Sequence, residues 1–388
     1  MLKLAFRDLV LKVGGYGGFT LSSIREKFKF TYYSKLLVYG KLLFDLHPKE
    51  NINELFGRSF EVNYIIDQII NGNWVVILGQ RMIGKTSLLK VSLNELEKKG
   101  YSTIYINLRG IRSLEGLLNL LIHEINRRKS LLETLKPSLN LQIGPLGIEL
   151  KHRNKPYNNL LELFLSLNRK TVIGIDEFQE VSKASRQLLN ILANTFASNR
   201  NISFIFTGSY IGVVKALFEQ KSTSPLYGRQ PTKIILKPFN EETSKNFLIK
   251  GFEEQKMKIS EETIEEVYKR FNGIVGWLTL FGNFHTIRKY DVNKAIIETI
   301  NEARKIMETE LEHFLKDKID KDIYKTIIQN MKRFNKWSEI KLATEIKLGR
   351  KINDKTFTQI LNTLLNSNII NKTNHEYHLA DPILKELY

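Results

Sequence analysis

Cysteine is absent from the 388 residues of this chain, and proline and glycine are sparse, with 8 and 23 residues. The absence of cysteine excludes a disulfide framework, a thiolate metal site and a cysteine nucleophile, and it fits a reducing cytoplasm. The low proline and glycine content excludes collagen-like and low-complexity classes. The sequence is therefore expected to fold into globular domains, and its length allows two or three of them.

Long hydrophobic runs are also missing. The longest, from Lys35 to Leu46, is interrupted by Lys35, Lys41 and Asp45 and is shorter than the roughly 20 residues that span a bilayer. Charged residues are scattered through residues 1–15, so this stretch lacks the apolar core of a secretory signal. We expect no membrane partner and a cytoplasmic location.

Acidic residues are outnumbered by basic ones, 41 against 59, and the formal net charge is +18. Such an excess favours a polyanionic partner such as a nucleic acid, a nucleotide or a membrane surface, and it does not choose among them.

Short apolar runs alternate with helical patterns over residues 74–236. Strands are expected at 74–79, 103–108, 171–175, 202–207 and 233–236, and helices after residue 86 and at 114–127, 160–167 and 186–197. This alternation predicts an α/β fold with a parallel sheet covered by helices on both faces. Residues 139–151 alternate around Gly144-Pro145 and predict a hairpin insertion.

The pattern changes after Pro238 to helices without strands, at 241–251 and 261–270, which predicts a small helical lid. From Asp322 onward, three helical patterns and two short strands, 369–372 and 377–379, predict a winged helix-turn-helix. We therefore expect four parts: an N-terminal basic extension of unknown role, an α/β core, a helical lid and a winged helix, at residues 1–43, 44–239, 240–318 and 319–388.

The most specific motif follows the first expected strand. It is the phosphate-binding loop (P-loop) pattern G-x-x-x-x-G-K-[ST], formed by Gly79, Gln80, Arg81, Met82, Ile83, Gly84, Lys85 and Thr86 and followed by Ser87 as a further candidate. Backbone N–H groups of such a loop point at phosphate, and the following helix adds its dipole. Lys85 is expected to reach the β- and γ-phosphates and Thr86 to ligate Mg²⁺. The pattern therefore predicts ATP and Mg²⁺ as cofactors.

A second motif ends the apolar strand at residues 171–175 with adjacent carboxylates, Asp176 and Glu177. Behind a P-loop, Asp176 is expected to orient the Mg²⁺ shell and Glu177 to polarise the attacking water. The pair favours hydrolysis of ATP over binding alone, although a nucleotide-binding module without turnover stays open.

Two weaker signals complete the set of candidate catalytic residues. The strand at 202–207 ends in Thr207-Gly208-Ser209, which offers a hydroxyl where the γ-phosphate and the water would meet. Arg229 stands in a loop before the next strand, the place of an arginine finger.

These motifs occur in a fixed order along the chain. Taken together with Glu54 to Arg58 ahead of the P-loop, Leu236-Lys237-Pro238-Phe239 after it and Asp381-Pro382 near the end, they resemble the archaeal ATPase family. That family belongs to the STAND-type branch of the AAA+ P-loop NTPases. The resemblance runs from about Phe44 to the C-terminus.

The resemblance implies a core sheet ordered 5-1-4-3-2, a helical lid and a C-terminal winged helix. It places Gly57 and Arg58 near the adenine and makes Asp176 and Glu177 the Walker B pair, with Thr207 or Ser209 at the sensor position. It also implies that Arg229 acts on the nucleotide of a neighbouring subunit, and hence a homo-oligomer.

Two positions depart from the family pattern. The lid segment Gly273 to Leu278 keeps its glycines and Trp277 but lacks a proline, and Met82 replaces a second arginine in the P-loop. The additional contact of an arginine side chain is therefore lost at Met82.

The expected third helix of the winged helix, residues 353–366, would present Lys355, Thr358, Gln359 and Asn362 to duplex DNA. Basic residues between Lys27 and Lys35, near aromatic ones, are equally suggestive. Two functions stay open: an ATPase whose nucleotide state controls DNA association, or a signalling switch that assembles on an unknown protein partner and hydrolyses ATP slowly or not at all.

Overall fold

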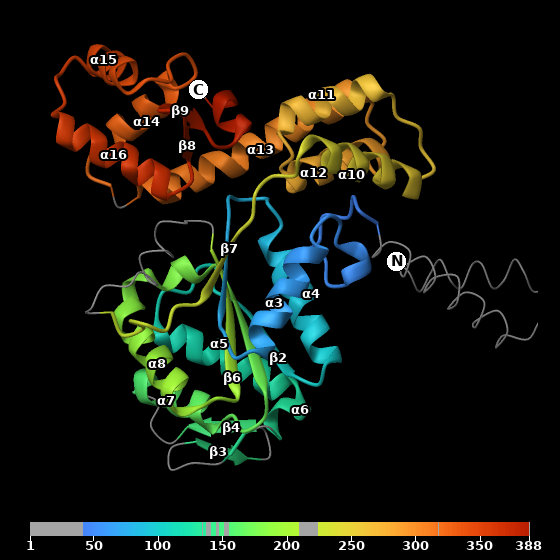
Figure 1. Cartoon of the computed structure of the whole chain (residues 1–388), viewed down its shortest axis with the longest axis vertical. Coiled ribbons are helices and arrows are strands. Elements are labelled where there is room, and N and C mark those ends of the chain that lie inside the picture. Colours follow the sequence, from blue (N-terminus) through green and yellow to red (C-terminus); the bar gives the residue numbers. More distant parts are fainter. Residues whose placement is uncertain are drawn as a thin grey trace, which may run out of the picture.

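The computed structural model arranges the chain in three groups of elements (Figure 1). It describes residues 42–133, 135–136, 141–144, 147–150, 155–208, 224–316 and 318–387. A sheet with its covering helices forms the lower part of the view, one helical group lies above it on the right, and the C-terminal group lies above it on the left. Predictions about residues 1–41, including their basic stretch, lie outside the described residues.

The central sheet has five strands, β1 (Val75–Leu78), β2 (Ser102–Asn107), β5 (Thr171–Asp176), β6 (Ile202–Gly208) and β7 (Thr232–Ile235). Their spatial order is β2-β5-β6-β1-β7, and every neighbouring pair is parallel. Strands β1, β5 and β6 are buried along their whole length, because parallel sheets of this kind are covered on both faces. Counted along the chain, this is the order 5-1-4-3-2, as the resemblance implied.

Helices cover both faces of this sheet. Helices α3 (Ser59–Ile70) and α4 (Lys85–Lys98) pack on one face, whereas α5 (Leu114–Arg127), α7 (Pro156–Ser166) and α8 (Ser185–Ser198) pack on the other.

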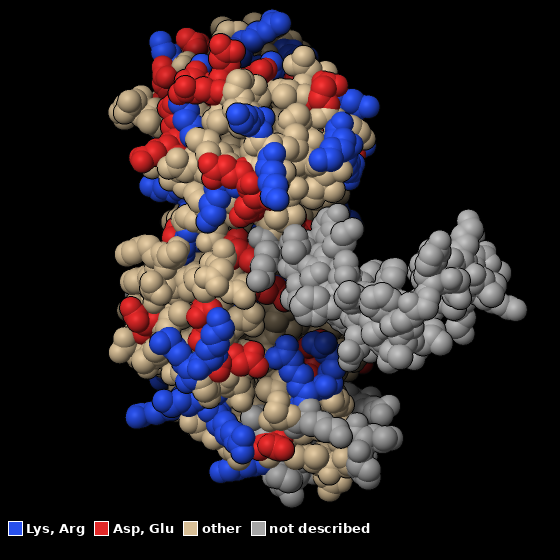
Figure 2. All heavy atoms as spheres, turned by 90° about the vertical axis from the view of Figure 1, so that its right-hand side faces the viewer, with Lys and Arg blue, Asp and Glu red and all other residues tan. Residues whose placement is uncertain are grey.

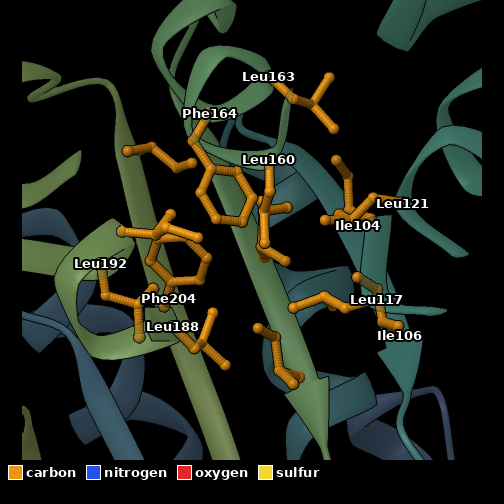
Figure 3. Packing of buried hydrophobic residues seen from close by; sticks show 14 of the residues in the cluster. Ile104, Ile106, Leu117, Leu121, Leu160, Leu163, Phe164, Leu188, Leu192 and Phe204 are labelled. Carbon is orange, nitrogen blue, oxygen red and sulfur yellow. The ribbon is translucent and has the colours of Figure 1, made fainter. Parts of the chain in front are cut away.

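The alternation of side chains along each strand separates the two cores. Val75 and Ile77 of β1 face α3 and α4, whereas Val76 and Leu78 face the opposite core. Figure 3 shows that opposite core, in which leucines of α5, α7 and α8 pack around strand residues such as Phe204.

Short elements fill the connections of the core. They are the 3-10 helices η1 (Ile52–Glu54) and η2 (Phe178–Ala184), the helix α6 (Lys129–Leu132), and the strands β3 (Leu141–Gly144) and β4 (Gly147–Leu150). Strands β3 and β4 pair in antiparallel fashion, which confirms the hairpin insertion.

The lid contains α10 (Glu241–Glu254), α11 (Glu261–Phe271), α12 (Val275–Thr286) and the first half of α13 (Val292–Leu315). The sequence analysis identified only the first two. Helix α12 is apolar on nearly every side and buried, so it has no polar face from which helical periodicity could be recognised. Within the described ranges, no helix combines the length and apolar composition needed to cross a membrane.

The C-terminal group is a winged helix, as predicted. It contains α14 (Lys321–Asn330), α15 (Trp337–Leu348), α16 (Asp354–Asn366), the antiparallel strands β8 (Ile370–Thr373) and β9 (Glu376–Leu379), and the 3-10 helix η3 (Pro382–Glu386). Leu311 and Leu315 at the end of α13 belong to its core. Helix α13 therefore contributes to the cores of both the lid and the winged helix.

The end of the winged helix is fastened to the lid. The indole Nε1–H of Trp277 in α12 donates to Asp381 Oδ2 at 3.0 Å, and both groups are buried. Ile383 of η3 lies in the lid core. Burial raises the pKa of Asp381 to about 6, against the opposing effect of the two hydrogen bonds that its carboxylate accepts.

Phe44 joins the segment before the P-loop domain to the lid. Its ring is fully buried between α10 and α12, where Gly251 and Gly282 leave room that any larger residue would occupy. It makes edge contacts with Phe247 and Phe252, with ring centroids 5.8 and 5.1 Å away. The domain limits predicted from the sequence stay predictions, and Phe44 packs with the lid.

We predict that Phe44→Ala lowers the free energy of unfolding by about 3–5 kcal/mol, because the lid cannot close on the cavity that remains. Urea-induced unfolding measures the change. Phe60→Ala is the control, because Phe60 is 79% exposed and its loss should cost at most about 0.5 kcal/mol. Equal losses in the two variants would contradict this account of Phe44.

Candidate active site

The P-loop connects the end of β1 to the start of α4. Gly84 is the N-cap of α4 and has φ 95°, in the left-handed region that favours glycine. Met82 also has a positive φ, 61°. The loop therefore curls so that backbone N–H groups at the helix N-terminus surround one point, the geometry that binds phosphate.

Lys85 is held inside this loop. Its Nζ donates to the carbonyl oxygens of Gly79 and Gln80 at 2.9 and 2.8 Å. Burial lowers the pKa of Lys85 to about 8, with the charges of Glu177 and Asp176 opposing the shift and that of Arg81 adding to it. A phosphate bound in the loop would thus take the place of these carbonyl oxygens and give the ammonium group a stronger, charged partner.

Asp176 lies at the carboxyl end of β5 and is 1% exposed. Three hydroxyl groups donate to its carboxylate: Thr86 of α4 at 2.8 Å, Tyr105 of β2 at 3.0 Å, and Thr207 of β6. The sequence analysis missed Tyr105, because the only sign of its position is the pairing of β2 with β5, which becomes known once the sheet is formed. Burial, followed by the charge of Asp176, raises the pKa of Tyr105, so its hydroxyl stays a donor.

Glu177 follows Asp176 with φ 57°, which turns its side chain away from the strand direction. Its Oε2 accepts a hydrogen bond from Gln179 Nε2, and its Oε1 lies 3.8 Å from Arg109 Nη2. Its backbone N–H donates to Thr207 Oγ1 at 3.3 Å. The two Walker B carboxylates therefore have different surroundings, since Asp176 is enclosed by hydroxyls and Glu177 faces a cation and an amide.

These groups border a cavity of about 250 Å³ between the P-loop, residues 43–58 and the lid. Lys85, Thr86 and Glu177 lie at one end, and Phe56, Phe239 and Phe247 lie at the other. A cavity with a cationic, hydroxyl-bearing end and an aromatic end fits a nucleotide, whose phosphates and base have those two characters.

Gly57 and Arg58 lie at the aromatic end. The Arg58 guanidinium is 4.7 Å from the centre of the Phe239 ring, and it donates to Glu61 Oε1 at 2.8 Å and to the carbonyl of Lys237 at 2.6 Å. A Cβ added to Gly57 would lie 3.3 Å from the Phe239 ring, and Gly57 has φ 66°. Arg58 lines this end of the cavity, with Gly57 next to it in the chain.

The remaining side chains of the P-loop anchor it to the rest of the molecule. Ile83 packs in the core formed by α3, α4 and the sheet, Met82 packs against the lid, and Arg81 forms an ion pair with Glu310 of α13. Gln80 is buried, and Ser87 Oγ accepts the backbone N–H of Lys49 at 3.0 Å. Each of these side chains thus has a contact with protein, and Arg81, Met82, Ile83 and Ser87 also line the cavity.

The structure does not bring every predicted residue to the cavity. Ser209 lies outside the described residues. Arg229 precedes β7 and lies at the amino ends of the parallel strands, whereas the P-loop follows the carboxyl end of β1. There it donates to the carbonyl of Ala193 at 3.4 Å and lies 5.8 Å from the centre of the Phe196 ring. Its action on a neighbouring subunit stays a prediction.

Two family models match this chain, one over the sheet and most of the lid and the other over the winged helix. A family model described as an ATPase domain predominantly from Archaea matches residues 55–281, which is more than half of the chain. The chain belongs to this archaeal ATPase family. The resemblance seen in the motifs is therefore confirmed. A second family model, the MCM protein C-terminal winged helix-turn-helix domain, matches residues 318–380.

Solved structures agree with this assignment. A Walker-type ATPase of Pyrococcus abyssi is 29% identical with a TM-score of 0.76, and the match covers 89% of this chain and 99% of that chain. The ORC2 protein of Aeropyrum pernix, in ADPNP-ADP complexes, is 17% identical with a TM-score of 0.61, covering 89% and 96%. The latter likeness concerns the fold alone. Among curated proteins, none matches this chain.

We predict that Tyr105→Phe lowers the free energy of unfolding by about 1.5–3 kcal/mol, because a hydrogen bond to a buried carboxylate is lost. The measurement is urea-induced unfolding. Tyr101→Phe is the matched control, since the structure records no side-chain hydrogen bond from Tyr101 among the described residues. If both variants lost the same stability, the Tyr105 hydroxyl would have no special part in holding Asp176.

Proposed function

We propose that this archaeal ATPase hydrolyses ATP with Mg²⁺ and couples its nucleotide state to association with DNA. The observation that carries the proposal is the convergence of Lys85, Thr86 and Glu177 at one end of a cavity of about 250 Å³, with the buried Asp176 bonded to Thr86 behind it. Within the AAA+ superfamily we assign it to the STAND-type branch on its motifs, with the cytoplasm, where ATP and DNA occur, as its place of action.

The donor set at Thr86 and Asp176 fits Mg²⁺. A hydroxyl and a carboxylate oxygen lie 2.8 Å apart beside the P-loop, and Mg²⁺ favours one or two such oxygen ligands completed by phosphate oxygens and water. When bound there, the ion would neutralise phosphate charge. Tyr105 and Thr207 keep the Asp176 carboxylate oriented in its absence.

The roles of the other residues follow from their positions. Lys85 exchanges its two carbonyl partners for phosphate oxygens and thereby holds the β- and γ-phosphates. Glu177 orients a water molecule and accepts its proton, and Thr207, which receives the Glu177 N–H, fixes that residue. Arg58 and Gly57 form the wall against the base.

The winged helix supports the DNA side of the proposal. Lys355, Thr358, Gln359 and Asn362 are all exposed on α16, as required of a helix that enters a major groove. Asp354 on the same helix carries a negative charge that would oppose contact with phosphate, and its Oδ1 lies 3.2 Å from Lys341 Nζ. On the lid face shown in Figure 2, by contrast, Lys and Arg are interspersed with Asp and Glu. We assign the contacts to phosphate to the winged helix because these α16 side chains are exposed.

A second function is favoured by one observation on the same domain. Leu342 and Ile346, one turn apart on α15, are 59% and 72% exposed. Adjacent apolar side chains gain free energy when a protein surface covers them, and they gain none from contact with phosphate. They support the alternative of a nucleotide-dependent switch whose winged helix docks on a protein partner.

We predict that the purified protein releases phosphate from Mg-ATP and that Glu177→Gln lowers the rate by about 100-fold or more, because the amide cannot accept the proton. Phosphate release is measured with and without duplex DNA at one fixed salt concentration, with the variant as background. A rate that rises with DNA supports coupling to DNA. A Glu177-dependent rate that is the same with and without DNA favours the protein-docking switch. Equal rates in the wild-type protein and the variant would contradict the assignment of the active site.

We also predict that ATP binding takes up a proton at alkaline pH. With its pKa lowered to about 8, Lys85 is largely neutral at pH 9, and phosphate binding restores its charge, so about 0.9 proton is taken up there. The affinity for ATP should therefore fall as the pH rises above 8.

The measurement is titration calorimetry at pH 9 in two buffers that differ in ionisation enthalpy. Lys85→Arg is the control, because a guanidinium stays charged at this pH and has no proton to gain. Binding heats that do not depend on the buffer would show that the lysine is already charged in the free protein.

A further inference from the structure

Five Lys and Arg side chains line the cavity among the described residues: Lys49, Arg58, Arg81, Lys85 and Arg109. Four of them are committed to protein partners at short distance. Lys49 donates to two backbone carbonyls at 2.6 and 3.1 Å, Arg58 and Arg81 pair with carboxylates, and Lys85 bonds to the P-loop. Of these four, Lys85 is the one whose partners belong to the phosphate site.

Arg109 differs from the other four. Its side chain is 64% exposed, and its partner is Glu177, with Arg109 Nη2 and Glu177 Oε1 3.8 Å apart. That separation is longer than a hydrogen bond, and the exposed guanidinium keeps its contact with water although the Glu177 carboxylate is 14% exposed, so the ion pair contributes little stability. The guanidinium can therefore change partner at small cost.

The backbone of Arg109, by contrast, is fixed beside the phosphate site. Its N–H donates to Asn107 Oδ1 at 2.9 Å, and the preceding N–H, of Leu108, donates to the carbonyl of Asp176 at 3.0 Å. These bonds fasten the turn after β2 to the strand end that holds the Walker B pair. The backbone of Arg109 is thus held in place, while its long cationic side chain can move.

We infer that Arg109 binds the terminal phosphate of ATP from within the same chain and leaves Glu177 when it does so. The inference rests on the proposed ATPase function and adds a residue to it. A terminal phosphate carries more charge than one carboxylate and can accept two parallel hydrogen bonds from a guanidinium. ADP has no γ-phosphate, so with ADP bound Arg109 stays with Glu177.

The exchange links nucleotide recognition to the state of Glu177. While Arg109 faces Oε1 of Glu177 and Gln179 binds Oε2, a positive charge lies beside the oxygen that would accept the proton of a water molecule. When Arg109 moves to the γ-phosphate, that charge leaves Oε1, and Gln179 still holds the other oxygen in place. Only a nucleotide with a γ-phosphate thus removes the cation from the general base.

The test compares affinities of the full chain for a non-hydrolysable ATP analogue and for ADP, both with Mg²⁺. We expect Arg109→Ala to weaken binding of the analogue by about 10-fold and to leave ADP within about 2-fold, because only the charged contact to the terminal phosphate is lost. Arg109→Lys should retain part of the discrimination. Arg112→Ala is the matched control, an exposed arginine of the same loop that does not line the cavity.

The outcomes separate this inference from the proposed function. If the wild-type protein binds both nucleotides and Lys85→Ala does not, the nucleotide site stands. If Arg109→Ala then left the ratio of analogue affinity to ADP affinity unchanged, the role of Arg109 would be overturned and the nucleotide site would stand. A wild-type protein that binds neither nucleotide would overturn both proposals.

Discussion

The buried carboxylate of Asp176 is the point on which the site depends. It accepts hydrogen bonds from hydroxyls of three separate elements, α4, β2 and β6. A buried charge that lost these donors would carry a large desolvation cost, so the three elements must keep their positions. That requirement explains the strand order, because β5 has to lie between β2 and β6 for Tyr105 and Thr207 to reach one side chain.

The sequence predicted much of this arrangement. The strands show as apolar runs because they are covered on both faces, and the P-loop and Walker B pair are local patterns whose chemistry can be assigned residue by residue. The winged helix could be recognised because the helices α14 and α16 each have one apolar face. These features depend on neighbours along the chain.

Other features depend on partners far apart in the sequence and could not be predicted from local patterns. Tyr105 donates a hydrogen bond to Asp176, and Phe44 fills the space beside two glycines of the lid. The partners in both contacts are too far apart in the sequence for a periodic pattern to reveal them. Helix α12 is buried and lacks a polar face, so it does not show the periodic change between polar and apolar residues by which a helix is recognised in a sequence. Arg109 is one of many exposed arginines until the turn after β2 is seen fastened to Asp176.

Met82 illustrates how a departure from a family pattern can have a structural reason. In place of a second arginine, its side chain packs on the lid, and its carbonyl accepts the N–H of Gly276 at the start of α12 at 2.8 Å. A side chain on Gly276 would collide with Met82. The loop and the lid therefore touch through main chain at the point where a nucleotide would lie.

Helix α13 carries a mechanical consequence. Its 24 residues span about 36 Å at 1.5 Å per residue, and its two ends are embedded in different cores. A rigid rod of that length works as a lever arm, in which a rotation of about 10° at the lid displaces the far end by about 6 Å. Glu310, which pairs with Arg81 of the P-loop, lies about 27 Å along this rod from its lid end, so a displacement passed from the P-loop to Glu310 would reach the winged helix at close to its own size.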